Sequence, residues 1–110
     1  MPTVSFQSTR DVIIRTEDFA AAVQFYEHVL GFPVTMRRDH IVGFETGAIQ
    51  LFVERGGPAH GPVFEMRAHD IAAAREHLVA AGCEVVEDNP TIPRCYMRDR
   101  YGVVFNLDRA

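Results

Sequence analysis

Glu65 and Arg67 form the ionisable pair whose spacing most favours chemistry. They lie two residues apart in an alternating segment, so their side chains face the same way on a strand. Burial raises the pKa of a carboxyl group toward a range useful for proton transfer, which makes Glu65 the candidate general base. The alternative role for Glu65 is a structural ion pair with an arginine, either Arg67 or Arg15.

Potential metal ligands are scattered along the chain. Five histidines occur, and we interpret all of them as surface residues: His28, His40, His60, His69 and His77. Cys83 and Cys95 do not form a CxxC pair, and we interpret them as reduced thiols of a cytosolic protein. The remaining oxygen donors would suit a hard cation better than zinc; they are Asp11, Gln50, Glu65 and Asn106.

An internal repeat indicates the elements that position these residues. The segment beginning at Asp18 (DFAAA) returns at Asp70 (DIAAA), 52 residues later, and each copy leads through a helical pattern to a glycine, Gly31 or Gly82. A period near 50 predicts one structural unit used twice. Each aspartate is expected to cap its helix, and each glycine to end it.

Apolar spacing predicts which helical residues are buried. The first helix has the stripe Phe19, Ala22, Val23, Tyr26, Val29 and Leu30, and the second has Ile71, Ala74, Leu78 and Ala81.

Alternating segments predict antiparallel strands with two different faces. Strong alternation occurs near residues 12–14, 48–53, 63–68 and 103–108, with weaker signals near 33–38, 41–45, 84–87 and 94–98. Residues 55–62 are rich in glycine and proline and predict a linker. Each half therefore has one strand, one helix and three further strands. We predict a single α+β domain over residues 1–110, with a first module at about 10–55 and a second at about 62–109.

Composition excludes several classes of protein. The 110 residues fit one domain, and 47% apolar and 24% charged residues are typical of a globular protein. A net charge of −4 argues against nucleic acid and anionic membranes as partners. No apolar run is long enough to cross a bilayer, and the N-terminal residues lack a signal-peptide pattern, so a cytoplasmic location is expected.

Two motifs resemble the vicinal oxygen chelate superfamily, which contains glyoxalases, bleomycin resistance proteins and dioxygenases. Asp18–Tyr26 followed by Leu30-Gly31-Phe32 is similar to the family's first helix, and Arg98–Leu107 is similar to its closing hairpin. The resemblance implies two tandem βαβββ modules that form incomplete barrels around a concave cavity, with helices on the convex side. In metal-dependent relatives, four side chains in that cavity hold the ion.

The resemblance places those four positions at Asp11, Gln50, Val63 and Asn106. One is a carboxylate, two are neutral amides and one is apolar, whereas divalent metals prefer imidazole and carboxylate ligands. The prediction is therefore no metal and no cofactor.

Strand alternation then predicts which side chains face the cavity. A ligand is expected to contact Asp11, Arg15, Gln50, Phe52, Glu65, Arg67, Tyr96 and Asn106. Phe52 and Tyr96 would stack on a flat molecule, although aromatic residues in strands more often belong to the core. The alternative interpretation is that this face is the wet outer surface of an antiparallel sheet.

Three functions are compatible with this pattern. The first is a metal-free binding protein that sequesters an antibiotic or an aromatic metabolite, and on family grounds a homodimer. The second is a metal-dependent glyoxalase-like lyase or extradiol-dioxygenase-like enzyme with an atypical ligand set. The third is a structural or regulatory module whose cavity is filled by its own side chains.

Overall fold

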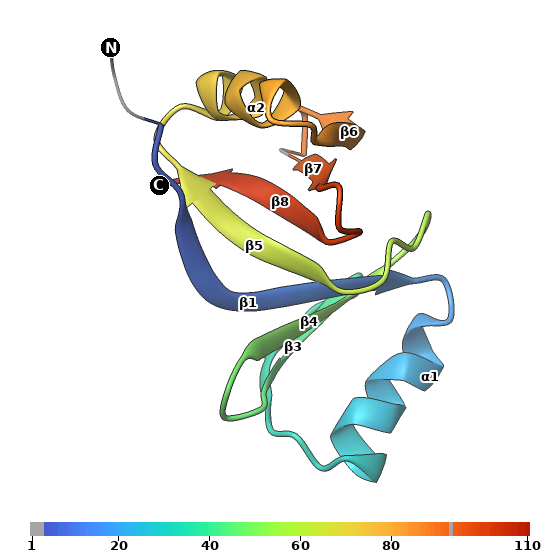
Figure 1. The fold of residues 1–110 in the computed structure, drawn as a ribbon. Helices are drawn as coiled ribbons and strands as arrows, with labels where there is room; N and C mark the ends of the chain where they lie inside the picture. The colour runs from blue at the N-terminus through green and yellow to red at the C-terminus, as the bar shows by residue number, and fades with distance from the viewer. Residues whose placement is uncertain (1–3, 93) are drawn as a thin grey trace. The chain divides into compact units, whose positions relative to one another are not determined.

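The computed structural model describes residues 4–92 and 94–110, which divide into two compact units (Figure 1). We call Arg10–Pro62 the first module. Residues 63–110, together with the N-terminal residues through Thr9, form the second module. Along the described chain, no helix is long and apolar enough to span a membrane.

Each module contains a strand, a helix and three further strands, so the α+β class and the repeated βαβββ order are confirmed. The elements of the first module are β1 (Gln7–Thr16, of which Gln7–Thr9 belongs to the second module), α1 (Phe19–Gln24), the π-helical turn η1 (Phe25–Val29), β2 (Val34–Arg37), β3 (Ile41–Glu45) and β4 (Gln50–Arg55). Those of the second are β5 (Val63–Ala68), α2 (Ile71–Ala80), β6 (Glu84–Asn89), β7 (Arg94–Arg98) and β8 (Val104–Arg109).

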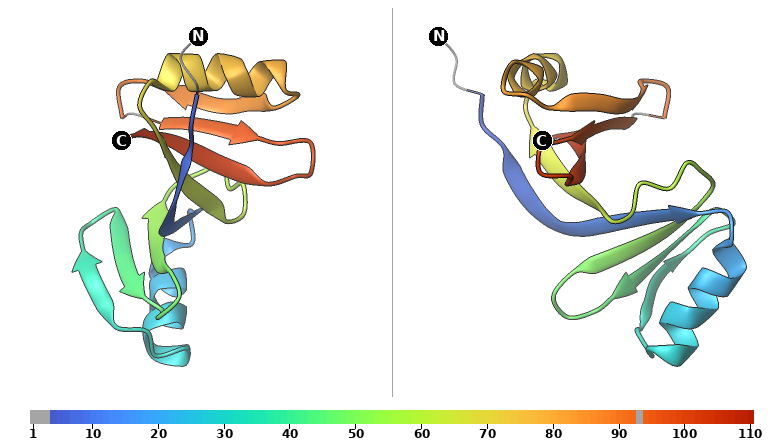
Figure 2. Two further views of the ribbon diagram at one scale, coloured as in Figure 1. Left: turned by 60° about the vertical axis from the view of Figure 1, so that its left-hand side comes forward. Right: turned by 45° about the vertical axis from the view of Figure 1, so that its right-hand side comes forward.

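The two modules use one strand order. It is β2-β3-β4-β1 in the first module and β5-β8-β7-β6 in the second. The first and last strands of each module run parallel, and the other neighbours are antiparallel. The four strands of each module form an open sheet with one helix on one face (Figure 2).

Alternate strand residues pack against that helix and form a separate core in each module. The first core has Phe44 at its centre, fully buried, together with Val12, Phe19, Val23, Val42, Leu51 and Val53. The second has the fully buried Met97, together with Ala68, Ala74, Cys95, Phe105 and Leu107. The side chains between these core positions necessarily point to the opposite face of each sheet.

The end of the first helix differs from the expected apolar stripe. Val29 is 67% exposed and Leu30 is 48% exposed, so the prediction that they are buried was wrong. The physical reason is the π-helical turn, in which the Leu30 N–H donates to the Phe25 carbonyl, five residues back. The extra residue in this turn rotates the following positions away from the sheet.

The same extra residue is visible in the repeat. Twelve residues lie between Asp18 and Gly31, whereas eleven lie between Asp70 and Gly82. The first helix therefore carries one residue more than the second, and the chain accommodates it as a π turn. Both glycines have positive φ, 73° and 103°, as predicted for residues that end helices.

The two aspartates before the helices behave differently. Asp70 has extended backbone and its Oδ1 accepts a hydrogen bond from the Ala73 N–H at 3.1 Å, as predicted. Asp18 makes no side-chain cap, which corrects the sequence expectation. Its ψ of 49° differs from the extended conformation typical of a cap, and its own N–H donates to Thr16 Oγ1 at 3.0 Å.

Candidate functional site

The side chains predicted to contact a ligand all lie on the sheet faces opposite the helices. This follows from their alternation with the core residues. The first module carries Asp11, Arg15, Gln50 and Phe52, and the second carries Glu65, Arg67, Tyr96 and Asn106.

Asp11 and Gln50 are neighbours in the first module. They are register partners on the parallel strands β1 and β4, and both are half-buried. A carboxylate and a carboxamide therefore lie side by side on this face. The pair offers hydrogen-bond acceptors and one amide donor for a polar group of a ligand.

Arg15 contacts the linker and is not exposed on the sheet face. Its side chain is buried, and its Nε and Nη2 atoms donate to the Pro58 carbonyl at 3.1 and 2.7 Å. A guanidinium–carbonyl pair of this kind fixes the segment after β4 against the end of β1. The sequence could not show this contact, because it joins an arginine to a backbone atom 43 residues away.

Phe52 lies against Gly43, a residue that the sequence analysis did not single out. A Cβ atom at Gly43 would lie 3.0 Å from both Phe52 Cε1 and Thr35 Oγ1, so a larger residue would require these side chains to shift. One edge of the half-buried Phe52 ring therefore lies close to the backbone of its register partner on β3. A glycine inside a strand was the available signal.

Glu65, Asn106 and Cys95 form a hydrogen-bonded chain in the second module. The Asn106 Nδ2 donates to Glu65 Oε1 at 2.8 Å, and its Oδ1 accepts from the Cys95 N–H at 2.9 Å. Asn106 is 8% exposed, and both polar ends of its buried amide have a hydrogen-bond partner. The sequence predicted a structural role for Glu65 as the partner of an arginine, but it did not predict this hydrogen bond to Asn106.

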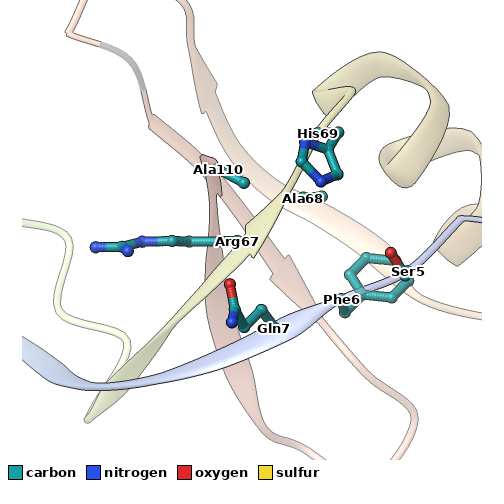
Figure 3. Close-up of a pocket in the computed structure, with 7 residues that line it drawn as sticks. All are labelled: Ser5, Phe6, Gln7, Arg67, Ala68, His69 and Ala110. Carbon is teal, nitrogen blue, oxygen red and sulfur yellow. The ribbon is translucent and has the colours of Figure 1, made fainter.

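Tyr96 and Arg67 differ in accessibility. Tyr96 is 2% exposed, and the Arg94 guanidinium carbon lies 5.3 Å from the centroid of its ring. Arg67 is exposed and borders a cavity of about 320 Å³, together with Ser5, Phe6, Gln7, Ala68, His69 and Ala110 (Figure 3). Its guanidinium extends away from the His69 and Phe6 rings.

The donor chemistry at the four positions expected for metal ligands does not fit a divalent ion. Val63 has no donor atom, Gln50 offers a neutral amide, and the Asn106 amide is already bound at both ends. Only Asp11 supplies a charge. Across residues 4–92 and 94–110, histidine, cysteine and acidic side chains form no group of three or more that could hold a metal.

The third and fourth of the expected ligand positions, Val63 and Asn106, are not register partners. Val63 is opposite Val104, whereas Asn106 is opposite Glu65. In the first module, by contrast, Asp11 and Gln50 are direct partners. The carboxamide of the second module is therefore shifted two residues along its strand.

Neither cysteine is an activated nucleophile. Burial raises the pKa of both thiols, and nearby carboxylates, Asp88 for Cys95 and Asp99 for Cys83, add to the shift. A raised pKa leaves little thiolate at neutral pH. Covalent catalysis through Cys83 or Cys95 is therefore disfavoured.

Two carboxylates of the first module have lowered pKa values. The Arg37 side chain hydrogen-bonds Glu27 and lowers its pKa. The Gly47 N–H and then the Arg10 side chain lower the pKa of Glu45. Both groups are held as anions by donors, which suits structural ion pairs rather than proton transfer.

The family model described as Glyoxalase-like domain matches residues 11–107. No curated protein matches the chain. A glyoxalase/bleomycin resistance protein/dioxygenase superfamily member from Vibrio splendidus 12B01 is similar at a TM-score of 0.62 and 18% identity, over 98% of this chain and 100% of that chain.

Two similar structures are enzymes of greater length. The Mn(II)-bound glyoxalase from Novosphingobium aromaticivorans has a TM-score of 0.63 and 19% identity, over 97% of this chain and 40% of that one. A variant of homoprotocatechuate 2,3-dioxygenase from B. fuscum has a TM-score of 0.61 and 17% identity, over 96% and 33%. At these identities the likeness concerns the fold alone.

Proposed function

The chain belongs to the glyoxalase-like domain family, and from this membership we propose that it binds a small organic molecule without a metal ion. The observation that carries the proposal is the state of Asn106. Its amide is buried and hydrogen-bonded at both ends, to Glu65 and to the Cys95 N–H, at a position where metal-dependent relatives are expected to present a ligand. Rotating it toward an ion would leave the buried Cys95 N–H without its acceptor.

The proposed ligand is a flat, partly polar molecule such as an aromatic metabolite or a planar antibiotic. Phe52 supports this class, because it is a half-buried aromatic residue on the face that also carries Asp11 and Gln50. Stacking on such a ring contributes apolar contact with little loss of side-chain entropy. The neighbouring Asp11 and Gln50 supply hydrogen-bonding groups on the same face of the sheet.

The test is a thermal-shift screen of aromatic acids, phenols and planar antibiotics, each with and without EDTA. A ligand of the proposed class raises the melting temperature equally in both conditions. Phe52→Ala is expected to weaken binding of that ligand. Phe64→Ala is the matched control, because Phe64 is 45% exposed and points to the helix side of its sheet.

Metal content, measured on the protein after incubation with Mn²⁺, Fe²⁺, Ni²⁺ or Zn²⁺ and desalting, completes the test. Near-stoichiometric metal, or ligand binding abolished by EDTA, would refute the proposal and favour the metal-dependent lyase or dioxygenase. Asp11→His with Gln50→Glu is the positive control, since it places a histidine and a glutamate side by side in the register of β1 and β4.

We also propose that the protein is a homodimer. Phe25, Val29 and Leu30 support this, because they are exposed apolar residues on one short segment after α1. Light scattering coupled to size exclusion measures the mass directly. A monomer at micromolar concentration would refute it.

A further inference from the structure

A second cleft lies on the helix side of the first module, on the face opposite Asp11, Gln50 and Phe52. It has a volume of about 480 Å³, within the size range of small-molecule pockets. It is lined by Phe19 and Val23 of α1, Val42 of β3, and the arginines Arg37, Arg38 and Arg55. The floor is apolar and the rim is cationic.

The rim carries more positive than negative charge. The lining contains three arginines and a single acid, Asp39, although the whole chain has a net charge of −4. The local charge at the rim is therefore opposite in sign to the net charge of the protein. A cationic rim of this kind attracts anions.

Two of the three guanidinium groups are available to a ligand. Arg37 is engaged by Glu27 at 2.8 Å. The Arg55 guanidinium carbon lies 4.6 Å from the centroid of the Phe19 ring, and its Nη2 makes one long contact, 3.4 Å, with the Asp39 carbonyl. The Arg38 side chain has no hydrogen bond or ion pair within the described part of the chain.

We propose that this cleft is a second ligand site, which takes an organic anion carrying a flat apolar ring. The carboxylate, sulfonate or phosphate group would accept charge-assisted hydrogen bonds from Arg38 and Arg55. The ring would contact the floor made by Phe19, Val23 and Val42. An inorganic anion would use only the rim, and a neutral ring only the floor.

The second module provides an internal control for this inference. A cavity of about 440 Å³ occupies the equivalent place, beside Ile71 and Ala72, which correspond to Phe19 and Ala20 in the repeat. Its charges balance once the ion pairs are removed: Arg75 is paired with Asp88 and Arg94 with Glu87, which leaves Arg109 and Asp108. The first cleft, with Arg37 paired to Glu27, keeps Arg38 and Arg55 against Asp39. Arg109 ends β8 as Arg55 ends β4. Selectivity for an anion is therefore specific to the first module.

The experiment uses two probes that share a ring system. One is 1-anilinonaphthalene-8-sulfonate, and the other is N-phenyl-1-naphthylamine, which lacks the sulfonate. Binding is followed by fluorescence and by amide chemical shifts of ¹⁵N-labelled protein. The sulfonate probe is expected to shift the amides of Ala20, Asp39 and Val42 with saturation.

Substitutions at the rim then test the anion contact. Arg38→Gln with Arg55→Gln is expected to weaken binding of the sulfonate at least about tenfold, since each lost contact is a charge-assisted hydrogen bond. It should leave binding of the neutral probe unchanged. Arg109→Gln should change neither. The unperturbed amide spectrum away from the cleft verifies that each variant is folded.

Three outcomes overturn the proposal: equal affinity of the parent and the double variant for the sulfonate, an equal loss with Arg109→Gln, or shifts confined to other segments. The site proposed above on the opposite face is tested separately. Phe52→Ala should not alter sulfonate binding at this cleft, so failure of either proposal leaves the other intact.

Discussion

The first and second modules repeat one path of strand, helix and three strands, and the strand register shows which of their residues correspond. Asp11 corresponds to Val63, and Gln50, which is the register partner of Asp11, corresponds to Val104, the partner of Val63. Polar groups that stand at one pair of positions in the first module are thus replaced by valines in the second. The second module places its amide, Asn106, two residues further along.

The two modules therefore use the polar groups of the same fold in different ways. The first module keeps an accessible polar pair on one face and an arginine-rimmed cleft on the other. The second uses its polar groups internally, in the chain of hydrogen bonds from Glu65 through Asn106 to Cys95. Both modules keep an apolar core on the helix side of the sheet, whereas the polar positions on the opposite face differ.

The largest expected effect tests whether the two cores are equivalent. Phe44 and Met97 are both fully buried at corresponding strand positions. Phe44→Ala should lower the free energy of unfolding by about 3–5 kcal/mol and Met97→Ala by about 2–5 kcal/mol, because each leaves a cavity. Urea denaturation measures both.

Val79→Ala is the surface control for these variants, because Val79 is 50% exposed on α2, and it should cost no more than about 0.5 kcal/mol. A loss below about 1 kcal/mol for either core variant would show that its cavity closes at little cost. A large loss for Val79→Ala would mean that urea denaturation does not separate core from surface positions in this protein.

The next prediction compares the contributions of the Asn106 and Gln50 carboxamides to stability. Asn106→Ala should cost about 2 kcal/mol, because it removes the side-chain oxygen that accepts a hydrogen bond from the buried Cys95 N–H. Gln50→Ala should cost about 0.5 kcal/mol or less, since the half-buried Gln50 amide has no hydrogen bond within the described residues. Equal losses in urea denaturation would contradict the division between an internal and an accessible polar group.

Much of the fold could be predicted from local patterns. The eight residues predicted to contact a ligand lie on the sheet faces opposite the helices, as the side-chain period of two in a strand requires. Alternation also predicted the strands near residues 41–45 and 94–98 with the bounds that the structure gives. The end of the first helix could not be predicted by a regular period, since one extra residue changed the turn there.

Hydrogen bonding at the candidate site was much less predictable. The alternation that placed Glu65 and Asn106 on one face carries no information on strand register, and the register decides that they touch. The contact between Arg15 and the Pro58 carbonyl depends on the course of the linker, which composition alone does not determine. Gly43 could have been noticed, because glycine inside a strand often marks a close approach.

A smaller effect distinguishes the two helix starts. Asp70→Ala should lower the free energy of unfolding by about 1 kcal/mol, because it removes the acceptor for the Ala73 N–H. Asp18→Ala should cost less than about 0.5 kcal/mol, since Asp18 makes no cap. Urea denaturation of the two variants side by side makes the comparison. A loss for Asp18→Ala as large as that for Asp70→Ala would show that Asp18 caps its helix in solution.

The smallest effect concerns acid and Glu45 of the first module, a carboxylate with a lowered pKa. Glu45 accepts hydrogen bonds from the Gly47 N–H and from Arg10, both at 2.8 Å, and its unfolded pKa is near 4.5. A pKa that is lower in the folded state stabilises the protein above pH 4.5, and this contribution disappears as the pH falls through the folded value. Unfolding measured between pH 3 and pH 7 should therefore show a shallower loss toward acid in Glu45→Gln than in the parent.

Glu76→Gln is the matched control for that measurement, because Glu76 is exposed on α2 and has no hydrogen bond or ion pair within the described residues. It should leave the acid limb unchanged. The Glu45 variant should instead differ most from the parent at neutral pH and converge with it below the folded pKa, where the parent carboxyl is also neutral. Parallel curves for the parent and Glu45→Gln would mean that the Gly47 and Arg10 contacts do not hold the carboxylate in solution, and the acid response would then have to arise from other groups of either module.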